Sequence, residues 1–292
     1  MGTFDENSGV RLMTYKTDLP VMMPPSPPRR DPLNFSLKLW HIIPLVALVL
    51  IGPSLAYAAA DEKGILSPLT VLLSWAPLLL KGFVFNLVIS VSAMAIGTAA
   101  GATLGLAQVS PTRPLRAGSW FITQFFRNAP WLVLLFFAMF LLPFEIDILG
   151  VKIPFPDWFK AILGLSLPVM ANVSEIVRGA VLSLPSGQWE AAESLAYTRR
   201  QTLWLIILPQ CIKRMLPPWM NLYAILTMAT VLASIVGVSE VMTLTGRALS
   251  AEGGRPELLA PFYGFVLLLF FAYCYPIARF TVRLEKKYAV IN

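Results

Sequence analysis

Residues 82–111 contain no charged side chain, and this uncharged, largely apolar run restricts the possible fold more than any other feature of the chain. A helix needs about 20 such residues to cross the hydrocarbon core of a bilayer. Further largely apolar stretches occupy residues 41–60, 120–142, 158–178, 215–239 and 258–278. Only 13% of the residues are charged, whereas soluble proteins carry about 25%. The sequence therefore predicts an all-α, polytopic membrane bundle of about six transmembrane helices.

The chain before residue 81 divides into three parts. Residues 1–38 are polar and rich in proline, which predicts a disordered cytoplasmic tail. Residues 39–60 are predicted to form the first transmembrane helix; the small residues at its end resemble a signal-peptidase site, so cleavage there is the alternative. Residues 61–80 are short and interrupted by prolines, which favours an interfacial segment on the outer face. Residues 81–287 would then form the main transmembrane domain.

Residues 185–210 are a polar, charged segment between apolar stretches, and they predict two short helices joined by a tight turn. The sequence Pro185-Ser186-Gly187 breaks the preceding helix, and Ser186 can cap the next one. Glu190 then falls in the first turn, where the helix dipole favours a negative charge. Three apolar residues of this helix are expected to share one face: Ala191, Ala192 and Leu195.

A second helix start follows in the same segment. Thr198 and Gln201 have the spacing of a capping box, so a helix is predicted from Arg199 to about Leu208, ending near Pro209. Two short helices between membrane spans would form a compact projection that another protein can hold.

Positive charge orients the spans relative to this projection. With the N-terminus in the cytoplasm, arginines and lysines concentrate in the tail, around residues 113–116, within residues 178–214 and after residue 278. The opposite orientation would place most of them outside, although positive residues tend to remain on the cytoplasmic side. The projection and both termini are therefore predicted to be cytoplasmic.

The stretch GQWEAAESLAYTRRQTLWLIILPQ, which begins at Gly187, resembles the EAA cytoplasmic loop of ABC importer permeases. The upstream SEIVRGAVLSLPSGQ and the downstream IVGVSEV resemble the branch that serves polar amino acids such as histidine, glutamine and glutamate. The resemblance extends from about Leu79 to Lys287. It implies the type I, MetI-like permease fold in a bacterial inner membrane.

The resemblance also implies how the chain works with other proteins. The chain itself would be a translocation subunit, not an enzyme, with no metal or other cofactor, and ATP and Mg²⁺ would bind a partner ABC ATPase dimer. Further expected partners are a second permease subunit, identical or related, a periplasmic amino-acid-binding protein and membrane lipid, but no nucleic acid. The residues expected to dock on the ATPase are Gly187, Gln188, Glu190, Ala191, Ala192, Ser194, Leu195, Ala196 and Pro209.

Two positions depart from the family pattern. Ala196 stands where the family usually has glycine, and a left-handed backbone costs an L-residue about 1 kcal/mol more than it costs glycine. Either the turn is built differently here or Ala196 carries that strain. In the fifth span the family usually reads KDTS, and here only Thr230 is kept. Any role of the missing lysine or aspartate is therefore in doubt.

Four polar residues in the predicted spans are candidates for the substrate path: Arg127, Asn172, Glu175 and Thr230. Glu175 and Arg178 can pair on one helix face, either to position the projection or as part of an intramembrane site. Arg127 could reach the inner surface, support a gate or face the path. Buried Asn and Thr also form hydrogen bonds between helices, so a purely structural role stays open for them.

The sequence contains no usable nucleotide-binding loop, metal-ligand spacing or nucleophile–base set, and Cys211 and Cys274 are expected to be free thiols. A permease driven by a separate ATPase agrees with this and is the prediction. The alternative is an ion-coupled secondary carrier of small polar solutes, which would call for inverted repeats and intramembrane carboxylates. No repeat is visible, and few acidic residues lie in the spans.

Overall fold

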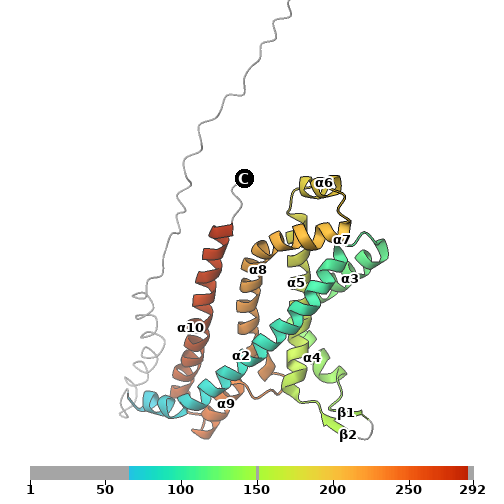
Figure 1. The fold of residues 1–292 in the computed structure, drawn as a ribbon. Coiled ribbons are helices and arrows are strands. Elements are labelled where there is room, and N and C mark those ends of the chain that lie inside the picture. Colours follow the sequence, from blue (N-terminus) through green and yellow to red (C-terminus); the bar gives the residue numbers. More distant parts are fainter. Residues whose placement is uncertain (1–65, 149–150, 289–292) are drawn as a thin grey trace, which may run out of the picture. The chain divides into compact units, whose positions relative to one another are not determined.

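The computed structural model describes residues 66–148 and 151–288, which fold into a helical bundle with one small β-hairpin (Figure 1). The predicted tail of residues 1–38 and the predicted first span lie outside the described residues. The long helices are α2 (Leu66–Gln108), α3 (Arg113–Asn128), α5 (Asp157–Leu182), α8 (Leu208–Ala229) and α10 (Pro256–Tyr288). The short elements are α4 (Trp131–Leu141), β1 (Glu145–Ile148), β2 (Val151–Pro154), α6 (Gly187–Ser194), α7 (Arg199–Gln201), the π-helical turn η1 (Thr202–Ile207), the 3₁₀ turn η2 (Thr230–Ser234) and α9 (Val241–Ala251).

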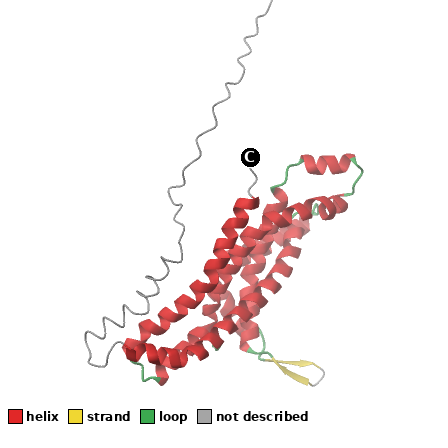
Figure 2. Ribbon diagram, turned by 60° about the vertical axis from the view of Figure 1, so that its left-hand side comes forward, coloured by secondary structure: helices red, strands yellow, loops and turns green. Residues whose placement is uncertain are grey.

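The two ends of the bundle differ in what projects from them. Helix α6 projects from the end drawn at the top of Figure 1, where α2 ends, α3 begins and α10 ends. The antiparallel β1–β2 hairpin and α9 lie at the opposite end, and Figure 2 shows the same separation from another side. We refer to these as the α6 end and the hairpin end.

Several helices have the length and apolar character of membrane spans. Four qualify: residues 68–108, 157–182, 199–234 and 256–287, and the bent pair of α3 and α4 would make a fifth within the described residues. The spans predicted at residues 158–178, 215–239 and 258–278 correspond to α5, to α8 with η2, and to α10. The chain is therefore a multi-pass membrane protein with an all-helical spanning part, as the sequence predicts. The hairpin and α9 were not predicted.

Helix α2 is longer than expected. Residues 66–80, which the sequence placed in a separate interfacial segment, form the first part of the same helix, which continues through Pro77. Pro77 removes one helical hydrogen bond, but the residues on both sides of it are held by packing. Leu72 and Leu79 are buried in a cluster with side chains of α9 and α10. Tertiary contacts therefore hold the helix together where local signals favoured a break.

The span predicted at residues 120–142 is also not straight. The chain bends by 106° between α3 and α4. The break lies at Ala129 and Pro130, which both have extended backbone conformations, with ψ values of 138° and 131°. Proline disfavours a helical conformation in the residue before it, which explains why α3 ends here.

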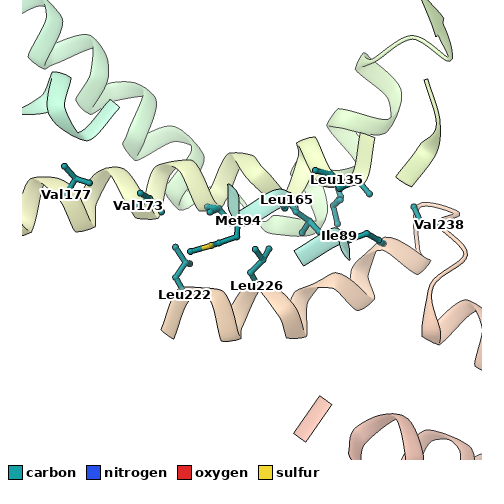
Figure 3. Close-up of a cluster of buried hydrophobic side chains, with 14 residues drawn as sticks. Ile89, Met94, Leu135, Leu165, Val173, Val177, Leu222, Leu226 and Val238 are labelled. Carbon is teal, nitrogen blue, oxygen red and sulfur yellow. The ribbon is translucent and has the colours of Figure 1, made fainter. Parts of the chain in front are cut away.

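The centre of the bundle is the contact between α2 and α5. A Cβ atom added at Gly97, Gly101 or Gly105 would lie within 2.7 Å of an atom of α5, so these glycines let the two backbones approach closely. Buried side chains from α2, α5 and α8 meet beside this contact, and Figure 3 shows Met94 of α2 next to Leu222 and Leu226 of α8. These three glycines therefore pack two helices of the same chain against each other.

Candidate functional site

The start of α6 differs in one respect from the prediction. The helix begins at Gly187 as expected, and Glu190 lies in its first turn. Ser186 occupies the N-cap position, but its side chain makes no capping hydrogen bond. Its backbone is already helical, with φ −58° and ψ −32°, whereas a capping serine is normally extended. The carbonyl of Ser186 accepts from the amides of Trp189 and Glu190 instead.

Ala196, just after the end of α6, has a left-handed backbone. Its φ is 59°, the one positive value at a non-glycine position among the described residues. The amide of Ala196 donates to the carbonyl of Glu193 at 2.9 Å, and the amide of Tyr197 donates to that of Ala192 at 3.0 Å. This is the Schellman pattern, which requires a left-handed residue at this position. The turn is therefore left-handed at Ala196, which carries the backbone strain.

The second arm of the projection begins where it was predicted. Thr198 and Gln201 form a complete capping box, with each side chain bonded to the other residue's backbone amide. The predicted end near Pro209 is wrong, because the helix continues through η1 into α8. In η1 the amide of Leu208 donates to the carbonyl of Leu203, five residues earlier. Pro209, which has no amide to donate, follows directly after this π turn.

The predicted docking residues divide between two faces of the projection. Those exposed on α6 and at its end recur at helical spacing and form one stripe: Gly187, Glu190, Ala191, Ser194 and Leu195. Leu195 is 72% exposed. We call these five residues the α6 stripe.

The other predicted docking residues lie elsewhere. Ala192, expected on the same face as Ala191 and Leu195, is only 2% exposed. Gln188 is half-buried and accepts a 2.7 Å hydrogen bond from Nε2 of Gln210 on α8. Ala196 is exposed at the turn, and Pro209 is exposed on the second arm.

The inward face of α6 attaches the projection to the bundle. Trp189 packs against a buried cluster from α5, η1 and α8 that includes Val181 and Ile207. The guanidinium of Arg199 lies 5.4 Å from the ring centre of Trp189, which joins the two arms by a cation–π contact. With the hydrogen bond between Gln188 and Gln210, these contacts hold α6 at fixed positions along its length. The helix is therefore anchored on one face and open on the other.

A cavity of about 540 Å³ lies between α3, α5 and α8, and it brings together three of the four predicted path residues. Arg127, Asn172 and Glu175 line it, together with Asn221 of α8. Asn221 is exposed, and Asn172 donates to the carbonyl of Pro168 on its own helix at 2.8 Å. This cavity is the candidate substrate site.

Two arginines hold the carboxylate of Glu175. Nη2 of Arg178 lies 2.7 Å from Oε2 of Glu175, which confirms the predicted pair. Nη1 of Arg127 lies 3.4 Å from the same oxygen, a partner that sequence spacing could not supply. The Arg127 side chain remains 45% exposed, whereas that of Glu175 is 15% exposed. Glu175 is thus neutralised from two helices, and Arg127 faces the open side of the cavity.

Thr230 does not belong to this cavity. It is fully buried, and its hydroxyl accepts a 3.0 Å hydrogen bond from Nδ2 of Asn86 on α2. The same amide donates to Glu240 at 2.8 Å. Glu240 also caps α9 by accepting from the amides of Met242 and Thr243. Thr230 therefore takes part in a network that joins α2, η2 and α9, apart from the other three candidates.

Arg214 was not among the predicted site residues. It lines the cavity, and its Nη1 donates to the carbonyl and the hydroxyl of Ser183, both at 2.9 Å. These bonds join the start of α8 to the end of α5. A positive residue just beyond the projection was visible in the sequence, but its contact with Ser183 depends on how the two helices cross.

A metal site or a disulfide has little support in the described part of the chain. Residues 66–148 and 151–288 contain no cluster of three or more His, Cys, Asp or Glu that could hold a metal ion. Cys211 and Cys274 are free and buried, in agreement with the prediction.

Comparison with known proteins places this geometry in context. Residues 93–287 match the family described as binding-protein-dependent transport system inner membrane component. The chain is 36% identical over 213 residues to the probable amino-acid ABC transporter permease protein YckA of Bacillus subtilis, covering 73% of this chain and 90% of that protein.

Two solved structures share the fold. One is the crystal structure of an amino acid ABC transporter with histidines, with a TM-score of 0.63 and 22% identity, over 74% of this chain and 96% of that chain. The other is an inward-facing form of the MetNI methionine ABC transporter, with a TM-score of 0.59 and 20% identity, over 74% and 99% of the two chains. The predicted MetI-like fold is confirmed.

Proposed function

Because the chain belongs to the family of binding-protein-dependent transport system inner membrane components, we propose that it is the translocation subunit of an ATP-driven importer of polar amino acids. The observation that carries the proposal is the two-sided α6, which is anchored to the bundle on one face and open along the α6 stripe on the other. An exposed, firmly held helix can transmit movement from a partner into the spans. The secondary-carrier alternative is not favoured, because this family works with binding proteins.

The partner at the α6 stripe is an ABC ATPase dimer that binds ATP and Mg²⁺ and performs the hydrolysis. Glu190 offers a negative charge in the first turn of α6, where the helix dipole stabilises it, and Leu195 offers an exposed apolar contact. The small residues Gly187, Ala191 and Ser194 let a groove approach the helix backbone. This combination fits a basic, partly apolar groove on the ATPase.

Replacing Glu190 with Lys tests the docking role. The charge reversal sets like charges against the partner, so we expect the full chain to insert normally but to bind the ATPase at least about tenfold more weakly, with a parallel loss of stimulated ATP hydrolysis. The measurement is co-purification of the ATPase and transport at matched membrane abundance. Glu193→Lys is the control, because this substitution makes the same charge change on the same helix but at a position outside the α6 stripe.

Equal ATPase association in wild type and Glu190→Lys would reject the docking role. Equal losses in both glutamate variants would also reject it, since they would reflect the overall charge of the projection and not the α6 stripe.

The substrate passes the cavity between α3, α5 and α8. Two arginines, Arg127 and Arg214, and one carboxylate, that of Glu175, line this cavity. Glu175 already pairs with Arg127 and Arg178. The remaining positive charge suits the carboxylate that every amino acid carries, and guanidinium groups bind carboxylates through paired hydrogen bonds. Asn172 and Asn221 add neutral polar groups. The cavity therefore fits a polar amino acid better than a cation or an apolar solute.

Asn221→Ala tests this path. Asn221 is exposed in the cavity, so its removal should leave folding intact and lower the initial rate of uptake of labelled histidine, glutamine or glutamate by about tenfold, as expected for one lost polar contact. Asn128→Ala is the control, because Asn128 is exposed on α3 but does not line the cavity. Unchanged uptake of all three amino acids in Asn221→Ala would exclude Asn221 from the path.

The complete assembly would contain a second permease subunit, identical or related, and a periplasmic amino-acid-binding protein that delivers the substrate. It would lie in a bacterial inner membrane with the α6 end and both termini in the cytoplasm. The positively charged residues at the α6 end support this orientation.

A further inference from the structure

A second and larger cavity, of about 1560 Å³, lies at the α6 end of the bundle and plays no part in the proposed substrate path. Its walls come from the end of α2, the start of α3, the end of α5 and the inner side of the projection. Four exposed arginines line it: Arg113 and Arg116 on α3, and Arg199 and Arg200 on α7.

These arginines are poorly neutralised. Glu190 and Glu193 also line the cavity, but no ion pair joins them to any of the four arginines within residues 66–148 and 151–288. The guanidinium of Arg199 lies over the ring of Trp189, and Arg178, a fifth arginine of the lining, is already paired with Glu175. The cavity therefore carries a surplus of positive charge directed at open space.

Exposed apolar side chains adjoin this charge. Leu115, Trp120 and Leu182 line the cavity and are 51%, 53% and 64% exposed. Phe121 and Phe125 follow on α3 toward the middle of the bundle, both more than half exposed. A tryptophan between charged and apolar residues is typical of the membrane–water interface. The surface thus changes from cationic to apolar in the direction that leads from the end of a span into the bilayer.

We propose that this cavity binds an anionic phospholipid. The headgroup phosphate lies among Arg113, Arg116 and the α7 arginines, and the acyl chains extend along Leu115, Leu182 and the exposed phenylalanines of α3. Basic pockets between membrane helices at the cytoplasmic side bind the headgroups of anionic lipids. A free anion would use only the arginines, and a protein partner would leave the apolar wall of α3 unexplained.

Such a lipid would connect the membrane to the projection. It would contact α3 with its acyl chains and α7 with its headgroup, so its presence would favour one position of α6 relative to the spans. Arg113 and Arg116 belong neither to the α6 stripe nor to the substrate cavity, whereas Glu190 of the stripe also lines this cavity.

The test uses the full chain purified with its associated subunits and stripped of lipid in detergent. Phosphatidylglycerol is titrated, and binding is measured by native mass spectrometry, with phosphatidylcholine and inorganic phosphate as parallel ligands. We expect phosphatidylglycerol to bind, and the double change Arg113→Gln with Arg116→Gln to weaken its binding by roughly 30-fold. The change of both residues to Lys keeps the charge and should retain binding within about threefold.

The matched control is Arg283→Gln with Lys286→Gln, which removes two exposed positive charges from α10 at the same end of the bundle. It should bind phosphatidylglycerol as wild type does. The lysine variant also shows whether the glutamine variant loses binding through misfolding.

Three results would overturn the proposal. The first is equal phosphatidylglycerol binding by the Arg113/Arg116 glutamine variant and the control. The second is inorganic phosphate binding as tightly as the lipid, which would make this a site for free anions. The third is loss of ATPase association in the glutamine variant with lipid binding unchanged, which would assign the cavity to the ATPase interface. Each result is independent of whether Glu190 docks the ATPase.

Discussion

Ala196 shows how one residue can preserve a turn that another residue would form more easily. The Schellman hydrogen bonds at the end of α6 require a left-handed backbone, and Ala196 adopts it with φ 59°. The position is exposed, so no packing contact requires a methyl group there. The strain lies at the junction between the two arms of the projection.

We predict that Ala196→Gly raises the stability of the projection by about 0.5–1 kcal/mol, because glycine adopts this backbone without the clash of a Cβ atom. The opposite result is expected for Ala191→Gly, an exposed helical position with no such strain, where glycine costs about 1 kcal/mol. The shift of the thermal unfolding midpoint in detergent measures both changes. A loss of stability in Ala196→Gly as large as that in Ala191→Gly would contradict the strain assigned here.

At the scale of elements, the contact between α2 and α5 depends on backbone approach. Gly101 lies so close to α5 that a Cβ atom there would be 2.5 Å from the carbonyl oxygen of Met170. The neighbouring atom belongs to the backbone, so it cannot move aside as a flexible side chain would. The two helices must separate before any larger residue fits.

Gly101→Ala is therefore expected to destabilise the bundle by about 1–3 kcal/mol, the range found for overpacking. Gly118→Ala is the control, since Gly118 is also helical but an added Cβ would meet nothing within 4 Å apart from the backbone of its own helix. Alanine there should be neutral or stabilising by up to about 1 kcal/mol. Membrane abundance and the thermal midpoint distinguish the two variants, and equal midpoints would mean that α2 and α5 can separate at little cost.

At the scale of the whole molecule, the two ends of the bundle carry different elements. The start of α3, the projection and the end of α10 lie at the α6 end, whereas the hairpin and α9 lie at the other. Arginines and lysines concentrate at the α6 end. We propose a cytoplasmic location for the α6 end because of this uneven distribution of positive charge.

Reporter fusions test the orientation. Fusions after Thr112 and Trp189 should report the cytoplasmic side, and fusions after Ile153 and Glu252 the outer side, because positive residues resist translocation. A cytoplasmic-only reporter and an outer-side-only reporter at each position serve as mutual controls. An outer-side signal at Trp189 would contradict both the orientation and the docking of an ATPase at α6.

Local residue patterns were enough to predict the membrane-spanning class, three of the spans, the start of α6 and the capping box at Thr198. These features depend on apolar length or on residues within about four positions of one another. For Ala196 the sequence left two alternatives open, a differently built turn or backbone strain, and its φ of 59° decides for strain.

Which side chains share a site depends on how the helices pack against one another. Arg127 meets Glu175 because α3 crosses α5, and Thr230 instead meets Asn86 because η2 packs against α2. Helix α2 continues through Pro77 because packing against α9 and α10 outweighs one lost hydrogen bond. Such outcomes depend on contacts between segments far apart in the chain, whose free energies exceed the local preferences that a sequence displays.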